Sequence, residues 1–221
     1  AGMKDENGHI TLPGFYDKVR AIDAEERAEL AKLPVNEEFL LKQTGSPSLW
    51  GEKGYTPVEQ IGARPTLDVN GMLSGFTGEG AKTVLPAKAM AKISMRLVPD
   101  QTPDEVYEQL VQYMEENAPD GVKWDIKVEH GGNPSISELG GVGVKAMSDA
   151  MSTVWGTPPL FKREGGSIPV VGDMQKTLGI ESVLTGFGLP DDRIHSPNEK
   201  QDLPTWYRGI DALIHFFYNL A

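Results

Sequence analysis

The 221-residue sequence predicts two consecutive domains: a small antiparallel sheet with helices on one face, followed by a parallel α/β unit. Three observations predict this. Apolar and polar residues alternate over three stretches between Thr66 and Glu129, as in half-buried strands. The break at residues 131–134, Gly-Gly-Asn-Pro, marks a domain boundary. Beyond it, helix-like and strand-like stretches alternate with short connections. The domains are therefore residues 1–134 and 135–221.

Residues 8–65 precede the sheet and are rich in Pro and Gly. Asp23 and Glu26 have the spacing of a capping box, which predicts a helix that ends at Pro34. Asn36 can cap a further turn or two before Gly45. We therefore expect an irregular arm that contains only short helices.

The sheet is predicted from strands at residues 66–72, 89–97 and 122–128, in each of which one side of the backbone is apolar. Thr102 and Glu105 form a capping box with Pro103 at the first helical position, so a helix begins there. Residues 117–121, Asn-Ala-Pro-Asp-Gly, end that helix. The order strand, strand, helix, strand gives an antiparallel sheet with helices on one face.

In the second domain, apolar residues at helical spacing predict a long helix from residue 139 to Gly156. Short strands are predicted at residues 160–162 and 182–185, with a helix at residues 169–178 between them. Parallel strands joined in this way bring the turn at 165–167 and the loop at 186–199 to one edge of the sheet. The C-terminal helix is expected to bury a stripe formed by Trp206, Ile210, Leu213, Ile214 and Phe217.

Composition excludes several classes of function. The net charge is −11 and the basic residues form no run, which argues against a nucleic-acid partner. No apolar run approaches the roughly 18 residues of a membrane span, so no membrane partner is expected. The absence of cysteine fits a reducing, cytoplasmic compartment and means that any metal must be held by His and carboxylate side chains.

The loop at residues 186–199 is the leading candidate site because it follows an apolar run on the carboxyl side of a predicted strand. It carries three carboxylates and His195, one of four histidines in the chain. A histidine in that position is a candidate metal ligand or catalytic group. Zinc takes about three or four protein ligands, and no second histidine has a suitable spacing, so the other ligands must come from elsewhere.

Two further segments carry groups whose chemistry suits a carboxylate ligand. Gly166 and Ser167 directly precede the helix predicted at residues 169–178, with Ser167 near its cap. The free N–H groups at that helix start suit an anion, although an ordinary capped helix explains these residues equally well. Arg96 lies on the polar side of its strand, where it can pair with a carboxylate or remain solvated.

Two candidates lie in connecting segments. The loop at residues 75–88 either places Lys82 or Thr83 at a ligand or only turns the chain. His130 is in phase with the apolar residues of its strand but stands next to two glycines, so it is either structural or turned outward.

Two familiar motifs are excluded. The nucleophile elbow of serine hydrolases needs Gly two residues after the serine, and Pro169 occupies that position after Ser167. The glycine-rich stretch at residues 75–83 has one residue too many before Lys82 for a phosphate loop.

Read together, several segments closely resemble the carnosinase-like dipeptidases of the dinuclear-zinc metallopeptidase family twenty, which also includes acetylornithine deacetylase and carboxypeptidase G. The resemblance runs from end to end and keeps the motif order. The motifs are residues 4–8 and 13–17, Arg64-Pro65-Thr66-Leu67, residues 80–86, Arg96-Leu97-Val98-Pro99, Gly165-Gly166-Ser167-Ile168-Pro169 and His195-Ser196-Pro197-Asn198-Glu199.

The resemblance implies a ferredoxin-like lid that mediates dimerisation, residues 1–134 with their N-terminal arm, and the C-terminal βαβα segment of a zinc-peptidase-like α/β catalytic domain, residues 135–221. By the same resemblance the chain is expected to be the carboxyl-terminal part of an enzyme. The general-base glutamate and most metal ligands have no counterpart in it, so the chain alone is expected to be inactive.

The resemblance also assigns roles. His195 is the expected last zinc ligand. Arg96 and Ser167, with the backbone of Gly166, are expected to bind the terminal carboxylate of the substrate. Thr83 and His130 are expected to reach the active site of the partner subunit, where His130 stabilises the oxyanion of the tetrahedral intermediate.

The function implied is that of a zinc-dependent hydrolase, a dipeptidase or related amidohydrolase, that works as a homodimer with two zinc ions. Manganese and cobalt remain open as metals. The substrate is a small peptide or N-acyl amino acid with a free carboxylate. The alternative is a non-catalytic dimerisation or small-ligand-binding module built on the same sheet.

Overall fold

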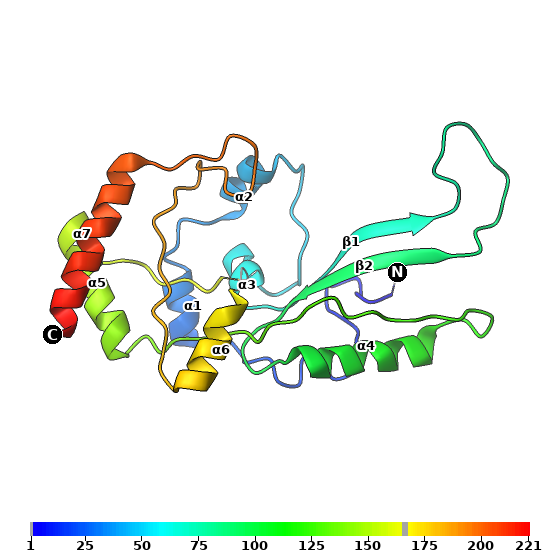
Figure 1. The fold of residues 1–221 in the computed structure, drawn as a ribbon, viewed down its shortest axis with the longest axis horizontal. Helices are drawn as coiled ribbons and strands as arrows, with labels where there is room; N and C mark the ends of the chain where they lie inside the picture. The colour runs from blue at the N-terminus through cyan, green and yellow to red at the C-terminus, as the bar shows by residue number, and fades with distance from the viewer. Residues whose placement is uncertain (1, 165–167) are drawn as a thin grey trace. The chain divides into compact units, whose positions relative to one another are not determined.

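The computed structural model describes residues 2–164 and 168–221 (Figure 1). The chain forms two compact units. Unit 1 comprises Ala1–Pro134 and Lys162–Pro169, and unit 2 comprises Ser135–Phe161 and Val170–Ala221. A two-stranded antiparallel sheet together with helices confirms the mixed α/β fold class. None of the helices in the described part of the chain is both long and apolar enough to cross a bilayer.

Three short helices form the arm of unit 1: α1 (Ala24–Leu30), α2 (Glu37–Thr44) and α3 (Pro57–Gly62). The Asp23 carboxylate accepts a hydrogen bond from the Glu26 amide at 2.8 Å and so satisfies one of the free amides at the start of α1. Asn36 caps α2 in the same way, and Gly45 ends it in the left-handed conformation. These caps confirm the predicted helix starts, and α3 is a third short helix of the arm, at a position where no helix start was predicted.

The strands β1 (Thr66–Ser74) and β2 (Ala89–Arg96) form the predicted antiparallel pair, with Thr66 opposite Arg96 and a bulge between Val69 and Gly71. Helix α4 (Pro103–Asn117) begins at its predicted cap, Thr102. A buried cluster joins the N-terminal turn, β1 and α4; its members are Ile10, Leu12, Phe15, Leu67 and Val106. The N-terminal turn, the sheet and α4 are therefore one packed body.

The strand predicted at residues 122–128 is not formed. These residues run as an extended segment after α4 without strand pairing (Figure 1), and Val122 and Val128 are mostly exposed. Alternation shows which side of the backbone is apolar, but a strand also needs a hydrogen-bonding partner. In the described residues β1 and β2 pair only with each other in the sheet.

In unit 2, α5 (Val142–Trp155) packs against α7 (Leu203–Leu220). Gly156 ends α5 as predicted. The predicted buried stripe of α7 is wrong, because its five residues are between 40% and 67% exposed. The buried positions are Gly209 and Ala212, whose small size lets neighbouring groups approach the helix closely. A Cβ atom on Gly209 would lie 2.6 Å from the Phe187 ring.

Helix α6 (Pro169–Leu178) is followed by Gly179 with a φ of 65°, as predicted. The strands predicted at residues 160–162 and 182–185 are absent, and these residues form no regular pairing. Their apolar runs predicted burial in a sheet, yet Leu160 and Leu184 are 48% and 59% exposed. A parallel strand is stabilised by layers on both faces, and the described residues provide no such layers here.

Candidate active-site residues

Asp192 organises the loop that carries His195. Its side chain is only 3% exposed. Oδ2 accepts a hydrogen bond from the Leu189 amide at 2.7 Å, and Oδ1 accepts one from the Lys200 ammonium group at 3.0 Å. These two hydrogen bonds hold the pKa of the Asp192 carboxyl below its ordinary value, and the bond from the Leu189 amide has the larger effect. One carboxylate therefore ties together both ends of the loop.

The backbone within this loop is unusual. Arg193, His195 and Asn198 have φ angles of 56°, 62° and 63°, in the left-handed region that residues with a Cβ atom seldom adopt. Two turns hold them there, through hydrogen bonds from the Ser196 amide to the Arg193 carbonyl (2.9 Å) and from the Glu199 amide to the Ser196 carbonyl (3.2 Å). Such conformations cost free energy and concentrate at functional sites.

The His195 side chain is exposed, so its imidazole is available to a ligand. Asp191 and Glu199 are exposed in the same loop, and Asp191 pairs with Lys200 at 3.1 Å. Within residues 2–164 and 168–221, no group of three or more His, Asp or Glu side chains is placed to hold a metal ion. One imidazole fits the chemistry of a zinc ligand, but the described residues do not complete a zinc site.

Arg96 and Thr83 belong to the sheet of unit 1. Arg96 ends β2, is exposed and makes no ion pair with a described residue, so its guanidinium group can accept a carboxylate ligand. Thr83 lies in the long exposed connection between β1 and β2. Lys82 was the other candidate in this connection. Its ammonium group lies 5.6 Å from the centre of the Phe76 ring and so already contacts an aromatic side chain.

His130 ends the extended segment that follows α4, and its side chain is exposed. The next two residues must be glycine for steric reasons. A Cβ atom on Gly131 would lie 2.8 Å from Pro103, and one on Gly132 would lie 2.7 Å from Pro169. This close packing constrains the backbone directly after the exposed His130.

Gly166 and Ser167 lie outside the described residues. On the N-terminal side of them, Arg163 donates a hydrogen bond from Nη2 to Glu26 Oε2 at 2.9 Å, and its Nε pairs with the same carboxylate. Gly62 makes room for this segment, since a Cβ atom there would collide with the Arg163 carbonyl oxygen. The segment before Gly166 is thus anchored on the arm of unit 1.

The candidate residues therefore divide between the units. Thr83, Arg96 and His130 belong to unit 1, and His195 belongs to unit 2. No hydrogen bond or ion pair connects Thr83, Arg96 and His130 to one another among the described residues. Sequence reasoning missed the roles of Asp192 and Arg163, although the Pro190–Asp191–Asp192 run is a turn signal that points to the first of them.

Comparison with known proteins gives consistent results along the chain. Residues 3–122 match the family model described as the peptidase dimerisation domain. The Cys-Gly metallodipeptidase of Candida albicans is 32% identical over 223 residues, which cover 97% of this chain and 46% of that protein. The human Beta-Ala-His dipeptidase is 28% identical, with 99% and 44% of the two chains covered.

Solved structures show the same fold. An M20 family metallo-carboxypeptidase from Sulfolobus solfataricus matches with a TM-score of 0.87 at 30% identity, covering 100% of this chain and 51% of that one. The dipeptidase Dug1p from Saccharomyces cerevisiae matches with a TM-score of 0.80 at 28% identity, covering 99% and 47%. The chain thus spans about half the length of the relatives that it matches.

Proposed function

The chain belongs to the M20 peptidase family, and from this premise we propose that it is part of a zinc-dependent dipeptidase or related amidohydrolase. The observation that carries the proposal is similarity over 97% of the chain to a Cys-Gly metallodipeptidase, with the loop around His195 included. In this proposal residues 1–134 form the lid, and residues 135–221 form the C-terminal segment of the catalytic domain.

We propose that His195 is a metal ligand. Three features support this role: the imidazole is exposed, its backbone is held in an uncommon conformation, and Asp192 fixes the loop from within. The metal, when bound, lowers the pKa of a water molecule so that it can attack a peptide or amide carbonyl. Zinc is the metal we favour, and manganese and cobalt are the competing candidates. The remaining ligands and the general base are proposed to come from outside the described residues.

We propose that the substrate is a small peptide or N-acyl amino acid with a free terminal carboxylate. Arg96 supports this assignment, because its exposed guanidinium group has no ion-pair partner among the described residues. Gly166 and Ser167 are proposed to complete the carboxylate site. The ion pair between Arg163 and Glu26 supports that role, since it anchors the segment that leads into these residues.

We propose that the protein works as a cytoplasmic homodimer formed through the lid. The β1–β2 hairpin and its connection expose a set of large apolar side chains that water disfavours: Met72, Leu73, Phe76, Val84, Leu85 and Met90. Thr83 lies in this same connection, so a partner that covers the set also approaches Thr83. His130 is proposed to stabilise the oxyanion in the partner's active site.

The test is hydrolysis of a dipeptide panel by the complete protein, with and without added zinc after removal of metal by a chelator. The expected result is activity that disappears with the metal, returns with zinc and is lost in His195→Ala. A complete protein that binds no metal and cleaves none of the dipeptides would instead support a non-catalytic dimerisation or ligand-binding module.

A further inference from the structure

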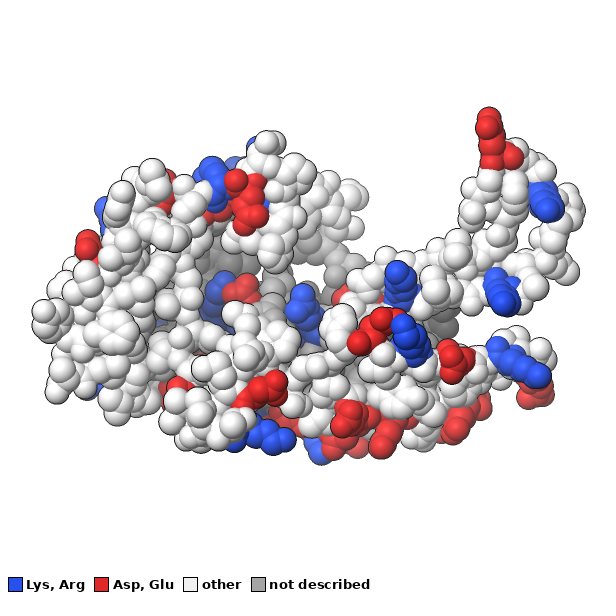
Figure 2. Space-filling view, in the orientation of Figure 1, with Lys and Arg blue, Asp and Glu red and all other residues white. Residues whose placement is uncertain are grey.

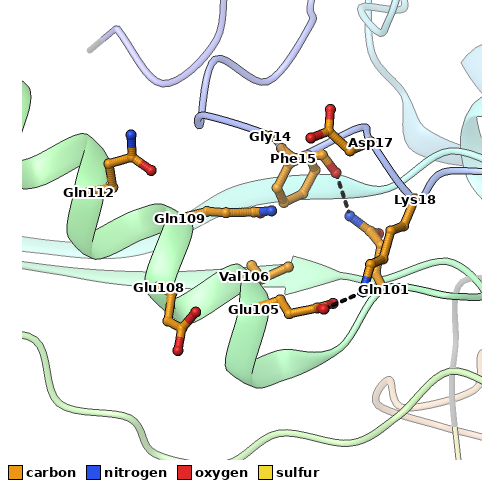
Figure 3. A pocket seen from close by; sticks show the side chains of 10 residues that line it. All are labelled: Gly14, Phe15, Asp17, Lys18, Gln101, Glu105, Val106, Glu108, Gln109 and Gln112. Carbon is orange, nitrogen blue, oxygen red and sulfur yellow. Dashed lines mark hydrogen bonds and ion pairs between the residues drawn. The ribbon is translucent and has the colours of Figure 1, made fainter.

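Gln101 holds the turn that connects β2 to α4. It is only 4% exposed and lines a surface cavity of about 250 Å³ in unit 1, between the N-terminal turn and α4 (Figure 3). Its Nε2 donates a hydrogen bond to the Phe15 carbonyl oxygen at 2.9 Å, drawn as a dashed line in Figure 3. Its Oε1 accepts one from the Val98 amide at 3.1 Å. One buried carboxamide thus joins main-chain groups from two distant segments of the chain.

The turn itself contains an uncommon backbone conformation. The Gln101 amide donates to the Val98 carbonyl oxygen at 3.2 Å, which closes a four-residue turn with Pro99 and Asp100 at its corners. Asp100 has a φ of 76°, a positive value that a type II turn requires at this position and that glycine usually supplies. A residue with a Cβ atom adopts this conformation at a cost, so the surrounding contacts must stabilise it.

Arg20 supplies one of these contacts at the surface. Its Nη2 donates to Asp100 Oδ1 at 2.9 Å, and its Nε pairs with the other carboxylate oxygen. The hydrogen bond from Arg20 holds the pKa of the Asp100 carboxyl below its ordinary value, so the pair is charged at neutral pH. The turn is therefore fastened to residues 15–20 twice, by Gln101 in the core and by Asp100 at the surface.

Arg96 lies two residues before the part of the turn that Gln101 holds. Its backbone pairs with Thr66 across the sheet. Val98 is buried, and its amide is bound to Gln101. The main chain at Arg96 is thus constrained by the sheet on one side and by the turn on the other. The point from which the exposed Arg96 side chain leaves the sheet consequently depends on the turn.

The surrounding charge makes this position important. From Arg96 to Asn117 the chain contains no other Lys or Arg, whereas α4 carries five carboxylates, and Figure 2 shows acidic side chains gathered along this helix. Such a field repels a substrate carboxylate, so long-range attraction does not compensate for a misplaced guanidinium group. A displacement of about 1 Å at a binding group can cost about 100-fold in rate.

We propose that Gln101 is a positioning residue for Arg96 and holds the end of β2 so that the guanidinium group meets the carboxylate of the substrate. This inference rests on the proposed role of Arg96. Without Gln101, the buried Val98 amide and Phe15 carbonyl lose their partners, and only a movement of the turn can restore hydrogen bonds to them. That movement displaces Arg96.

The test compares two substrates of the complete protein: the dipeptide of the panel that is hydrolysed fastest, and its C-terminal amide. Gln101→Met keeps the approximate shape of the side chain and removes both hydrogen bonds. It is expected to lower the ratio of kcat/KM for the acid to kcat/KM for the amide by about tenfold, through KM for the acid. A loss of folded protein lowers both values equally and leaves the ratio unchanged, so the ratio separates positioning from stability.

Three further variants test the route through Arg96. Gln112→Met makes the same change at an exposed residue of α4 whose hydrogen bond to Glu116 stays within the helix, and it is expected to leave the ratio unchanged. In an Arg96→Ala background, Gln101→Met is expected to have no further effect on the ratio. Arg20→Gln loosens the turn from its surface side and is expected to lower the ratio by about two- to fivefold, which keeps the test decisive if Gln101→Met does not fold.

The outcomes distinguish this inference from the proposed function. A wild type that treats acid and amide alike removes Arg96 from the carboxylate site, and the role of Gln101 is then refuted with it. If Arg96→Ala abolishes the discrimination but Gln101→Met and Arg20→Gln retain it, the proposed function stands and Gln101 is not a positioning residue. A further fall in the ratio when Gln101→Met is added to Arg96→Ala would show that Gln101 acts on another group.

Discussion

Arg64 and Glu52 form a two-bonded ion pair in which Arg64 Nε and Nη2 each lie 2.8 Å from a different carboxylate oxygen. Both side chains are nearly buried, at 8% and 11% exposed. The guanidinium group also stands over the rings of Tyr16 and Tyr55 at 4.9 and 4.3 Å. Although desolvation by burial opposes it, the hydrogen bond from Arg64 to Glu52 keeps the pKa of Arg64 above its ordinary value. The contact of Arg64 with the Tyr16 ring links this ion pair to the N-terminal turn.

We predict that Glu52→Gln destabilises unit 1 by about 3 kcal/mol, because it leaves the buried Arg64 without a counter-charge. The double variant Glu52→Leu with Arg64→Met is expected to recover much of that loss, since no unpaired charge remains. The measurement is the free energy of unfolding in urea. The single variants Glu52→Leu and Arg64→Met, the double variant and the wild type form a double-mutant cycle. Additive effects of the two substitutions would show that the pair is not coupled.

We predict that Asp192→Asn loosens the loop that carries His195. The variant keeps an acceptor for the Leu189 amide but loses the charge that holds Lys200. Hydrogen exchange of the Leu189 and Lys200 amides is expected to quicken, while exchange in α4 stays unchanged. Exchange rates equal to those of the wild type would contradict the role assigned to Asp192.

The same loop is expected to loosen in acid. The folded-state pKa of Asp192 is depressed, so its stabilisation is fully present above the unfolded-state value of about 3.9 and is lost as the pH falls through the lower folded-state value. The loop is therefore expected to be equally protected at pH 5 and pH 7 and to open below about pH 4. Asp192→Asn removes this local acid transition, and a transition that survives in the variant would assign it to another group.

We predict that His195→Ala in the complete protein lowers zinc affinity by more than about 100-fold, because a direct ligand contributes more than the groups that orient it. The measurement is zinc content after dialysis against a competing chelator, together with dipeptide hydrolysis. His215→Ala is the matched control, since His215 is an exposed histidine in the same unit. Equal zinc content in the two variants would remove His195 from the metal site.

We predict that Arg96→Ala raises KM by about 10- to 100-fold for dipeptides with a free carboxylate and changes kcat little, because a charged hydrogen bond to the bound substrate is lost. Dipeptides with an amidated C-terminus provide the control. The wild type is expected to discriminate against them, and the variant is expected to treat acid and amide alike. Discrimination that persists in the variant would place the carboxylate elsewhere.

We predict that Leu85→Glu weakens the proposed homodimer by about tenfold or more. Leu85 is 92% exposed in the hairpin connection, so the substitution is tolerated by the monomer, whereas a buried carboxylate is costly at an interface. Sedimentation equilibrium gives the dissociation constant. Lys88→Glu changes the charge of the same connection without removing an apolar side chain, and an equal effect in both variants would indicate general repulsion.

Local signals predicted the elements whose determining contacts span a few residues. Asp23 and Asn36 cap their helices through amides three residues away, and Gly156 ends α5. The pairing of β1 with β2 followed from alternation in neighbouring stretches. The strands predicted at residues 122–128, 160–162 and 182–185 are absent, because a strand depends on a pairing partner that alternation and apolarity do not identify.

The candidate site was predictable in part. The sequence singled out Thr83, Arg96, His130 and His195, and their chemical roles remain predictions. It did not reveal the anchor between Arg163 and Glu26, which are 137 residues apart in the chain. Nor did it reveal that Asp192 rather than a backbone turn alone holds the loop of His195.

By itself the sequence determined the family, the caps of the helices and the residues available for chemistry, because these depend on residue identity and short spacing. Only the tertiary structure decided which side of α7 is buried. Gly209 and Ala212 are buried there, and the larger apolar residues stay exposed, because close packing favours small side chains at the contact. It also decided that Gln109 lines a cavity, since a cavity is formed by segments distant in the sequence, and that its Oε1 is buried with no hydrogen-bond partner among the described residues.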